Sequence, residues 1–568
     1  MVKRWVQKEL PDEEDVQRLS QEINVNEVLA TVLLQRGVKD FDQAKQYFRP
    51  SLDDLHDPFL MKDMDVAVDR ILKAFKQREK ILIYGDYDVD GTTSVATLYR
   101  FIKSMYPNCD FYIPDRYKEG YGISEKGIEW AKESNIKLII SLDCGIKAVN
   151  LVGKAKSYGI DFIICDHHLP GDELPPAVAV LDPKRKDCEY PFKELSGCGV
   201  GFKLAQALAK VSSEADEKLL WQSLDFVAVS IAADIVPITG ENRILAHFGL
   251  EVLNKHPSAG LKALIDLGSY KGKLAIMNIV FGIGPRINAA GRMEHAHSAV
   301  RLLLAEDEAE TYRLAKLINE SNTRRKDFDS QITNEAINMI EANDRTLSSK
   351  STVLFKSDWH KGVIGIVASR CIDKYYRPTV ILTESNRKAT GSARSVNGFD
   401  IYEALCECED LLDQFGGHMY AAGLTLEIDK VEEFRTRFEK TVSEKITEEQ
   451  LIPRIDVDYQ IDLDVIDTKF YNILRQMAPF GPQNMQPIFV TENLRVHDRP
   501  RLLKGEHLKF KVVQGEGGKI MEAIGFGFGQ YYDLVNSGMR FKMAYTIEEN
   551  TYMGNKSLQL YVKDIKFD

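Results

Sequence analysis

The sequence has few cysteines and no long apolar run. Its 568 residues include eight cysteines, and no two of them form a Cys-x-x-Cys pair. This argues against a zinc ribbon or a disulfide framework. No stretch approaches the roughly 18 apolar residues of a membrane-spanning helix, and no apolar run follows the charged first ten residues. We therefore expect a cytoplasmic protein with reduced thiols and no membrane partner.

An excess of positive charge is also absent. The formal net charge is -11 at pH 7, which argues against a protein that coats nucleic acid non-specifically, because such binding depends on Lys and Arg neutralising phosphates. A nuclease is compatible with this charge, since it needs only a local positive channel beside an acidic metal site.

The chain is too long for one hydrophobic core, because single cores stop growing at roughly 250 to 300 residues. Hydrophobic residues make up 44% of the sequence and charged residues 28%, as in globular domains. The residue pattern predicts a helical leader at 1–75, an α/β domain at 76–295, a connecting helix at 296–345, a smaller α/β domain at 346–450 and an all-β barrel of the OB type at 451–568.

In the first α/β domain, short apolar runs alternate with amphipathic segments from Lys80 onward. This order indicates a mostly parallel sheet with helices on both faces. Metal-ligand residues follow three of the runs: Asp86, Asp88 and Asp90, then Asp143, then Asp166-His167-His168. Ligands bind at the carboxyl ends of strands in such sheets. The three clusters are therefore expected to converge on one edge.

Three closely spaced carboxylates repel one another unless a cation compensates them. The alternative to a metal site is an acidic turn or a calcium loop, but Gly91 and the expected helix arrive too early for the calcium-loop spacing. Imidazole with carboxylates suits Mn²⁺, Fe²⁺ or Zn²⁺, and a carboxylate-dominated pair of sites suits Mn²⁺ or Mg²⁺. Asp234 follows an apolar helical run, where a buried carboxylate needs a partner.

These segments resemble the DHH phosphoesterase superfamily, which is named for the triplet at 166–168. The resemblance includes GDYDVDG at 85–91, LDCG at 142–145 and AADIVP at 232–237. Segments that resemble the RecJ nucleases within this superfamily are FGIGPRINAAGR at 281–292, WHKGVIGIVA at 359–368, GGH at 416–418 and PFGPQN at 479–484. The resemblance covers about residues 20–568.

The resemblance implies a DHH catalytic domain at 76–295, a DHHA1 substrate-binding domain at 346–450 and an OB domain after them. It also implies two divalent cations, Mn²⁺ or Mg²⁺, with these ligands and a neighbouring His168: Asp88, Asp90, Asp143, His167 and Asp234. Tyr84 stands where pyrophosphatase relatives carry a His ligand. Either one metal position is weaker, or Asp86 fills it.

Further residues are expected to bind the substrate. By resemblance, the DHHA1 domain binds substrate phosphate and holds a 5′ end, through Ser392, Arg394, Ser395 and His418, with Arg286 and Arg292 along the channel. A Gly-rich turn with solvated arginines is the alternative. In the OB region, the aromatic candidates for stacking on bases are Phe510, Phe526, Phe528 and Tyr545. For any single one of these, a place in the barrel core is the stronger expectation.

The function expected from this resemblance is a 5′ to 3′ single-stranded-DNA exonuclease that releases 5′-mononucleotides in DNA repair and recombination. We expect a monomer, with a single-strand-binding protein or a helicase as candidate partners. One alternative is an oligoribonuclease or small-nucleotide phosphodiesterase, but a dinucleotide needs no barrel for binding. The other is a non-catalytic replication scaffold, but a protein that had lost catalysis would not be expected to retain a cluster of mutually repelling carboxylates.

Overall fold

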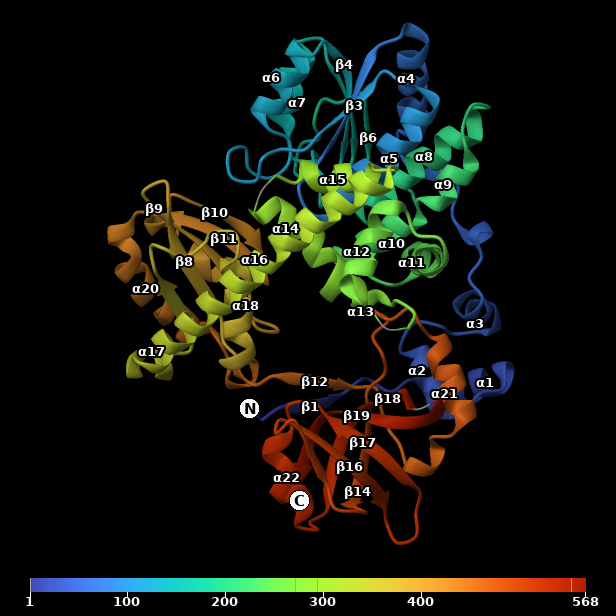
Figure 1. The fold of residues 1–568 in the computed structure, drawn as a ribbon, viewed down its shortest axis with the longest axis vertical. Helices are drawn as coiled ribbons and strands as arrows, with labels where there is room; N and C mark the ends of the chain where they lie inside the picture. The colour runs from blue at the N-terminus through green and yellow to red at the C-terminus, as the bar shows by residue number, and fades with distance from the viewer. Residues whose placement is uncertain (1, 271, 294, 553, 568) are drawn as a thin grey trace. The chain divides into compact units, whose positions relative to one another are not determined.

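The computed structural model of the chain describes residues 2–270, 272–293, 295–552 and 554–567. The chain divides into two compact units (Figure 1). The first unit comprises Met1–Leu55, Pro237–Thr239 and Arg454–Asp568, and the second comprises His56–Val236 and Gly240–Pro453. In the described part of the chain, no helix is long and apolar enough to cross a bilayer.

The second unit contains a sheet of five parallel strands in the order β3-β2-β4-β5-β6. The strands are β2 (Lys80–Gly85), β3 (Cys109–Tyr112), β4 (Ile136–Leu142), β5 (Asp161–Cys165) and β6 (Ala179–Leu181). Their apolar runs are buried on both faces, as expected for a parallel sheet between helices. The predicted parallel-sheet domain is thereby confirmed.

Helices cover both faces of this sheet. On one face, Leu82, Ile139 and Phe162 form a core with α6 (Glu125–Glu133) and α7 (Val149–Ser157). The helices α4 (Met64–Gln77), α5 (Val89–Met105) and α8 (Gly197–Val211) pack together on the other face (Figure 1). Helix α5 begins at Val89, shortly after β2 ends at Gly85, which leaves this strand-to-helix turn at the carboxyl edge.

A helical layer follows the sheet. Its helices are α9 (Glu217–Gln222), α10 (Leu224–Ala233), α11 (Gly240–Lys255), α12 (Ala259–Gly268), α13 (Ile276–Asn278), the π-helical turn η3 (Ile279–Ile283), α14 (Gly284–Met293) and α15 (His297–Leu304). The 34-residue helix α16 (Glu308–Glu341) then leads to the second α/β domain, with α17 (Asp344–Ser348) after it. It packs against α14 at one end and, through Ile332, Ala336 and Ile340, joins the core of the next domain at the other.

The smaller α/β domain has a five-stranded mixed sheet in the order β10-β11-β9-β8-β7. The strands are β7 (Thr352–Phe355), β8 (Thr379–Ser385), β9 (Lys388–Arg394), β10 (Gln414–His418) and β11 (Ala421–Leu426). Only the β7–β8 pair is parallel. The helix α18 (Ile364–Lys374) packs with α16 in one core, and α19 (Ile401–Cys406) and α20 (Val431–Lys445) contribute to another.

The first unit is built on a barrel. Its strands run in the order β13-β14-β18-β19-β17-β16-β15, and an additional β14–β16 pairing closes the sheet. The strands are β13 (Tyr459–Gln460), β14 (Phe489–Val496), β15 (Arg501–Leu503), β16 (His507–Gln514), β17 (Ile520–Gly525), β18 (Phe541–Tyr552) and β19 (Asn555–Phe567). Closure by five strands matches the predicted OB type.

The N-terminal segment belongs to the same unit as this barrel. Strand β1 (Arg4–Gln7) pairs in parallel with β12 (Arg454–Val457). The leader helices are α1 (Glu13–Ile23), α2 (Glu27–Leu34) and α3 (Phe41–Phe48). Leu19, Leu29 and Leu33 from these helices share one hydrophobic core with Phe470 of α21 (Thr468–Gln476) and with the barrel. The leader therefore completes the C-terminal core.

Candidate active site

The register of the parallel sheet brings four aspartates to one edge. Gly85 lies opposite Leu142, Leu142 opposite Cys165, and Cys165 opposite Leu181. The next residues in sequence are Asp86, Asp143, Asp166 and Asp182. The strands thus end at the same level, and each is followed by a carboxylate at the carboxyl edge. Asp182 was not among the residues that the sequence singled out.

The acidic loop after β2 is a tight strand-to-helix turn. Asp88 caps α5, where its Oδ1 accepts a hydrogen bond from the Gly91 amide at 3.0 Å. A Cβ at position 91 would lie 2.4 Å from the Asp86 carbonyl oxygen, so only glycine fits there. The turn therefore fixes Asp86, Asp88 and Asp90 around the start of one helix.

Asp90 is held by donors from two other helices. Its carboxylate accepts hydrogen bonds from the Gly197 amide at 2.7 Å, the Cys198 amide at 2.8 Å and the Ser230 hydroxyl at 2.7 Å. The two amides belong to the N-terminus of α8, which favours a negative charge. The Asp90 side chain is therefore buried and held in a fixed orientation.

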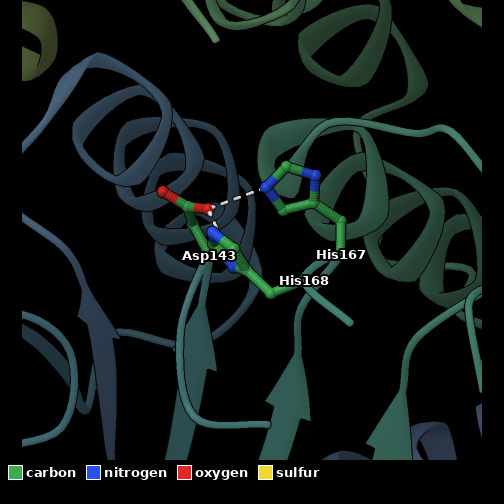
Figure 2. A group of neighbouring side chains, drawn as sticks. All are labelled: Asp143, His167 and His168. Carbon is green, nitrogen blue, oxygen red and sulfur yellow. Dashed lines mark hydrogen bonds and ion pairs between the residues drawn. The ribbon is translucent and has the colours of Figure 1, made fainter. Parts of the chain in front are cut away.

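His167 lies beside Asp143 and His168 at the carboxyl edge of the sheet (Figure 2). Its Nε2 is 3.1 Å from Asp143 Oδ1, 3.6 Å from Asp234 Oδ2 and 3.7 Å from Asp90 Oδ2. Among the described residues, two groups have ligand atoms within 4.8 Å of one another: Asp143 with His167 and His168, and Asp90 with His167 and Asp234. His167 belongs to both groups.

The first member of the DHH triplet positions the third. Asp166 Oδ1 accepts hydrogen bonds from the His167 amide at 2.8 Å and from His168 Nδ1 at 2.7 Å, and its Oδ2 accepts one from the Ile146 amide at 2.9 Å. Burial alone would raise the pKa of Asp166, but the bond from His168 lowers it to about 2. Burial opposes the charge of His168, yet the same bond raises the pKa of His168 to about 9.

The remaining carboxylates repel one another. Burial, and then the charges of Asp90 and Asp88, raise the pKa of Asp143 well above its usual value, and burial followed by Asp90 raises the pKa of Asp234 to about 8. Burial lowers the pKa of His167, so that its imidazole is neutral and offers a lone pair. A divalent cation would relieve this repulsion, and the donor set of carboxylates with one imidazole suits Mn²⁺.

Tyr84 and Asp86, the two residues considered for the position of the missing His ligand, have different surroundings. The Tyr84 hydroxyl donates to the Gly122 carbonyl at 3.0 Å and accepts from the Ser124 amide at 3.1 Å, within the core of the domain. Asp86 Oδ1 accepts from the Gly122 amide, whereas its buried Oδ2 has no hydrogen-bond partner. Asp86 is therefore the better candidate to fill the position of the missing His.

Arginines gather where the parallel-sheet domain meets the smaller α/β domain. Arg292 Nη1 donates to the Gly362 carbonyl at 2.8 Å, and Arg394 Nη1 donates to Ser392 Oγ at 2.8 Å. Burial, and then the charge of Arg116, lower the pKa of both Arg292 and Arg394, to about 10 for Arg292. Three mutually repelling guanidinium groups form a site suited to an anion such as phosphate.

Sequence reasoning missed Arg116 and Tyr121. Both lie in the loop after β3, which carries no regular pattern from which a role could be predicted. The Arg116 guanidinium lies over the Tyr87 ring, 4.8 Å from its centroid. The Tyr121 hydroxyl is 3.3 Å from the Asp143 carbonyl oxygen, to which it donates, and 3.3 Å from His168 Nε2.

The other residues predicted to bind phosphate have different surroundings. Ser395 Oγ donates to the Phe399 carbonyl at 2.7 Å, and His418 is exposed at the end of β10. Arg286 donates to the Gly282 carbonyl, the Tyr270 hydroxyl and Asn319. Arg286 is thus occupied in holding a local turn.

The four barrel aromatics divide by exposure. Phe510 and Tyr545 are 3% and 0% exposed and belong to the barrel core, which was the stronger expectation for each. A base cannot reach them, so they are removed from the candidates for stacking. Phe528 is half-buried against the same core. Phe526 is 53% exposed, with the rings of His507 and Tyr561 at 5.2 Å and 5.6 Å. Of the four, Phe526 alone presents an open face.

Comparison with known proteins places these features in a family. Three family models match: the DHH family N-terminal domain at residues 80–231, the DHHA1 domain at 348–444 and the RecJ OB domain at 457–564. A parallel sheet with Asp and His at its carboxyl edge, followed by an arginine-bearing DHHA1 domain, defines a DHH/DHHA1 phosphoesterase. The match to the RecJ OB domain indicates the RecJ branch of these phosphoesterases.

Individual relatives agree with the models. The single-stranded-DNA-specific exonuclease RecJ of Bacillus subtilis is 39% identical over 99% of this chain and 70% of its own, and that of Escherichia coli is 32% identical over 89% and 90%. The crystal structure of Thermus thermophilus RecJ with Mn²⁺ matches with a TM-score of 0.83 at 26% identity, covering 99% of this chain and 79% of that one. The chain belongs to the RecJ family.

Proposed function

We propose that the protein is a single-stranded-DNA-specific exonuclease that hydrolyses phosphodiesters from the 5′ end and releases 5′-mononucleotides. The observation that carries this proposal is the convergence of Asp90, Asp143, His167 and Asp234 at one sheet edge, in a chain whose relatives are named for this activity. Related RecJ structures contain Mn²⁺ or Mg²⁺, and a divalent cation is the cofactor here.

The residues that would hold two cations are Asp90, Asp143, His167 and Asp234, whose ligand atoms lie close together, and Asp88, which stays a prediction from the resemblance. Asp86 offers its unpartnered Oδ2. When bound, such cations lower the pKa of an attacking water and stabilise the leaving oxygen. His167, neutral through burial, contributes Nε2. The α8 amides hold the Asp90 carboxylate in place before any ligand arrives.

His168 has a separate role in this proposal. Its Nδ1 proton is directed to Asp166, and the raised pKa keeps the ring positively charged at neutral pH. The Nε2 atom, 3.3 Å from the Tyr121 hydroxyl, would carry a proton that this hydroxyl and a phosphate oxygen beside the ligand group could share. Asp166 acts through His168 as a positioning residue and does not contact the phosphate.

The proposed direction of digestion rests on the resemblance to RecJ, and the arginine site is where the 5′ end would be held. Arg116, Arg292 and Arg394, with Ser392, would bind the terminal 5′-phosphate, because guanidinium groups donate paired hydrogen bonds to phosphate oxygens. A strand held by this end presents its first phosphodiester to the Asp and His side chains. Ser395 and His418 remain predictions for this binding site, and Phe526 is the barrel aromatic that we retain for base stacking.

We retain the predicted division into leader (1–75), DHH domain (76–295), connecting helix (296–345), DHHA1 domain (346–450) and OB domain (451–568). Within the leader, α1, α2 and α3 share the barrel core, whereas α4 packs on the parallel sheet. A role in DNA repair and recombination, a monomeric state, a cytoplasmic location, and a single-strand-binding protein or helicase as partner stay predictions. The small-nucleotide phosphodiesterase is less favoured because it needs no barrel, and the non-catalytic scaffold because the ligand residues are intact.

Digestion of end-labelled DNA tests the proposal. A 5′-labelled single strand with Mn²⁺ should release labelled mononucleotide as its first product, whereas a 3′-labelled strand should shorten gradually. Duplex DNA with blunt ends should resist, and chelator should stop the reaction. Labelled mononucleotide appearing first from the 3′ end would contradict the direction, and equal digestion of duplex would contradict the strand specificity.

A further inference from the structure

A strained and exposed isoleucine follows the candidate ligand Asp234. Ile235 has a φ of 60° and is 62% exposed. A β-branched residue rarely adopts this left-handed conformation, which glycine or asparagine would accept with less strain. Single exposed apolar residues are ordinary on protein surfaces, but strain beside a reactive centre is typical of functional positions. Folding alone does not explain why an isoleucine, and not glycine or asparagine, occupies this strained and exposed position.

A second exposed apolar side chain lies on a neighbouring turn. Phe281 is 72% exposed and belongs to η3, which packs against α10, the helix that ends before Asp234. Arg286 fixes this turn by donating to the Gly282 carbonyl at 2.8 Å and to the Tyr270 hydroxyl at 3.2 Å. The aromatic ring is thus presented to solvent from a rigid support.

The helix α14 relates this turn to the arginine site. At its start, a Cβ on Gly284 would be 3.6 Å from Ala233 Cβ and 3.9 Å from Val89 Cγ2, the neighbours of Asp234, Asp88 and Asp90. Near its end, Gly291 approaches the Tyr87 carbonyl, and Arg292 bonds to Gly362. Ten helical residues span about 15 Å. The candidate metal ligands therefore lie beside α14. The Phe281 turn precedes one end of this helix, and Arg292 lies near the other end.

We infer that Ile235 and Phe281 contact the nucleotides on the 3′ side of the scissile phosphate. The inference rests on the proposed function, in which the arginines hold the 5′-phosphate. A strand held there and crossing the Asp and His side chains leaves toward the other end of α14. Phe281 offers a ring for base stacking, which is sequence-tolerant because every base has a π-face, and Ile235 packs against the adjoining sugar.

The test compares Ile235→Asn and Phe281→Ala with the wild-type protein and with Val211→Ala, which alters another exposed apolar residue, 49% exposed at the end of α8. Binding of a fluorescent strand of about ten thymidines is measured by anisotropy in chelator. Inhibition of Mn²⁺-dependent digestion by 5′-thymidine monophosphate is measured alongside, because that ligand reaches only the arginine end. The Tm of each protein is measured by thermal unfolding.

We expect Ile235→Asn and Phe281→Ala each to bind the strand about tenfold more weakly, as for the loss of one stacked or packed base. The inhibition constant of the monophosphate should stay within about twofold, and Ile235→Asn should not lower Tm, because it relieves strain. Val211→Ala should bind as the wild type does. Strand affinities within about twofold of wild type would overturn the inference.

A different pattern would assign the residues a structural role. Lower Tm together with equal losses for strand and monophosphate would show that Ile235 and Phe281 only support the site, which also overturns the inference. If the wild-type protein digests no single strand, the proposed function fails instead. The comparison of strand affinities in chelator still decides whether the two side chains contact DNA.

Discussion

Replacing Asp234 with asparagine should stabilise the metal-free protein and weaken its response to Mn²⁺. In the folded protein, burial and the charge of Asp90 raise the pKa of Asp234 from 3.8 to about 8. A carboxyl with a raised folded-state pKa contributes stability that is fully present below about pH 4 and is lost as the pH rises to about 8. Asparagine does not titrate, so the variant should gain on the wild type across this window.

The size of the effect follows from the shift. It corresponds to at most about 6 kcal/mol, and because the Asp234 side chain is 30% exposed, solvent screening reduces this to about 1 to 3 kcal/mol. The variant should therefore unfold about 2 to 10 °C higher than the wild type at pH 8 in chelator, with a smaller difference near pH 5.

With Mn²⁺ bound, the wild type should unfold at a higher temperature than the variant. Saturating cation stabilises a folded protein by about 2.7 kcal/mol at a hundredfold excess over Kd, and the variant has lost one anionic ligand. Differential scanning calorimetry at both pH values, with chelator or Mn²⁺, measures all four cases for each protein. Identical Tm values for variant and wild type in every condition would refute the account of repelling carboxylates that await a cation.

The remaining predictions concern the other residues of the site and the barrel. Alanine at Asp143 or His167 should abolish hydrolysis without changing the circular dichroism spectrum, and more than a few percent of activity in both variants would exclude them as ligands. Arg394→Ala should raise KM about tenfold or more for 5′-phosphorylated strands and less for 5′-hydroxyl strands, while Arg286→Ala should not discriminate between the two ends. A protein limited to residues 56–453, confirmed as folded, should still cleave short oligonucleotides but bind long strands more weakly and with a shallower salt dependence. Unchanged binding of long strands would mean that the barrel does not hold them.

The truncation must remove both ends of the chain because of how the first unit is built. Leu19, Leu29 and Leu33 pack in the same core as the barrel. Deleting the barrel alone would uncover these leucines, and an exposed apolar patch favours aggregation. The sequence predicted helices in the leader correctly but did not reveal this partner, since the contact joins the two ends of the chain and local periodicity contains no information about such pairs.

The candidate metal site was largely predictable because local patterns and one topological rule decide it. Apolar runs located the strands, and parallel strands place the residues that follow them at one edge. The function of Asp166 was less accessible, because only the structure shows its carboxylate directed to backbone amides and to His168. Asp182 follows a three-residue strand, and burial raises its pKa to about 7.

The substrate-binding residues were harder to predict. Arg394 stands in a recognisable Gly-rich motif, whereas Arg116 lies in an irregular loop and becomes notable only when its charge is found beside Arg292 and Arg394. In the barrel, alternating side chains face inward and outward, but alternation does not say which set faces inward. Phe510 and Tyr545 therefore looked equivalent to Phe526 in the sequence, although they are buried and it is not.

The most direct test of the central claim is the first product released from a 5′-labelled single strand by the wild-type protein and by His167→Ala, each with Mn²⁺ and with chelator. His167 lies within 4 Å of three candidate carboxylate ligands, so its loss should affect both groups at once. We predict labelled 5′-mononucleotide from the wild type with Mn²⁺ alone. Equal release of this product by His167→Ala, or by the wild type in chelator, would contradict cation-dependent hydrolysis at this site.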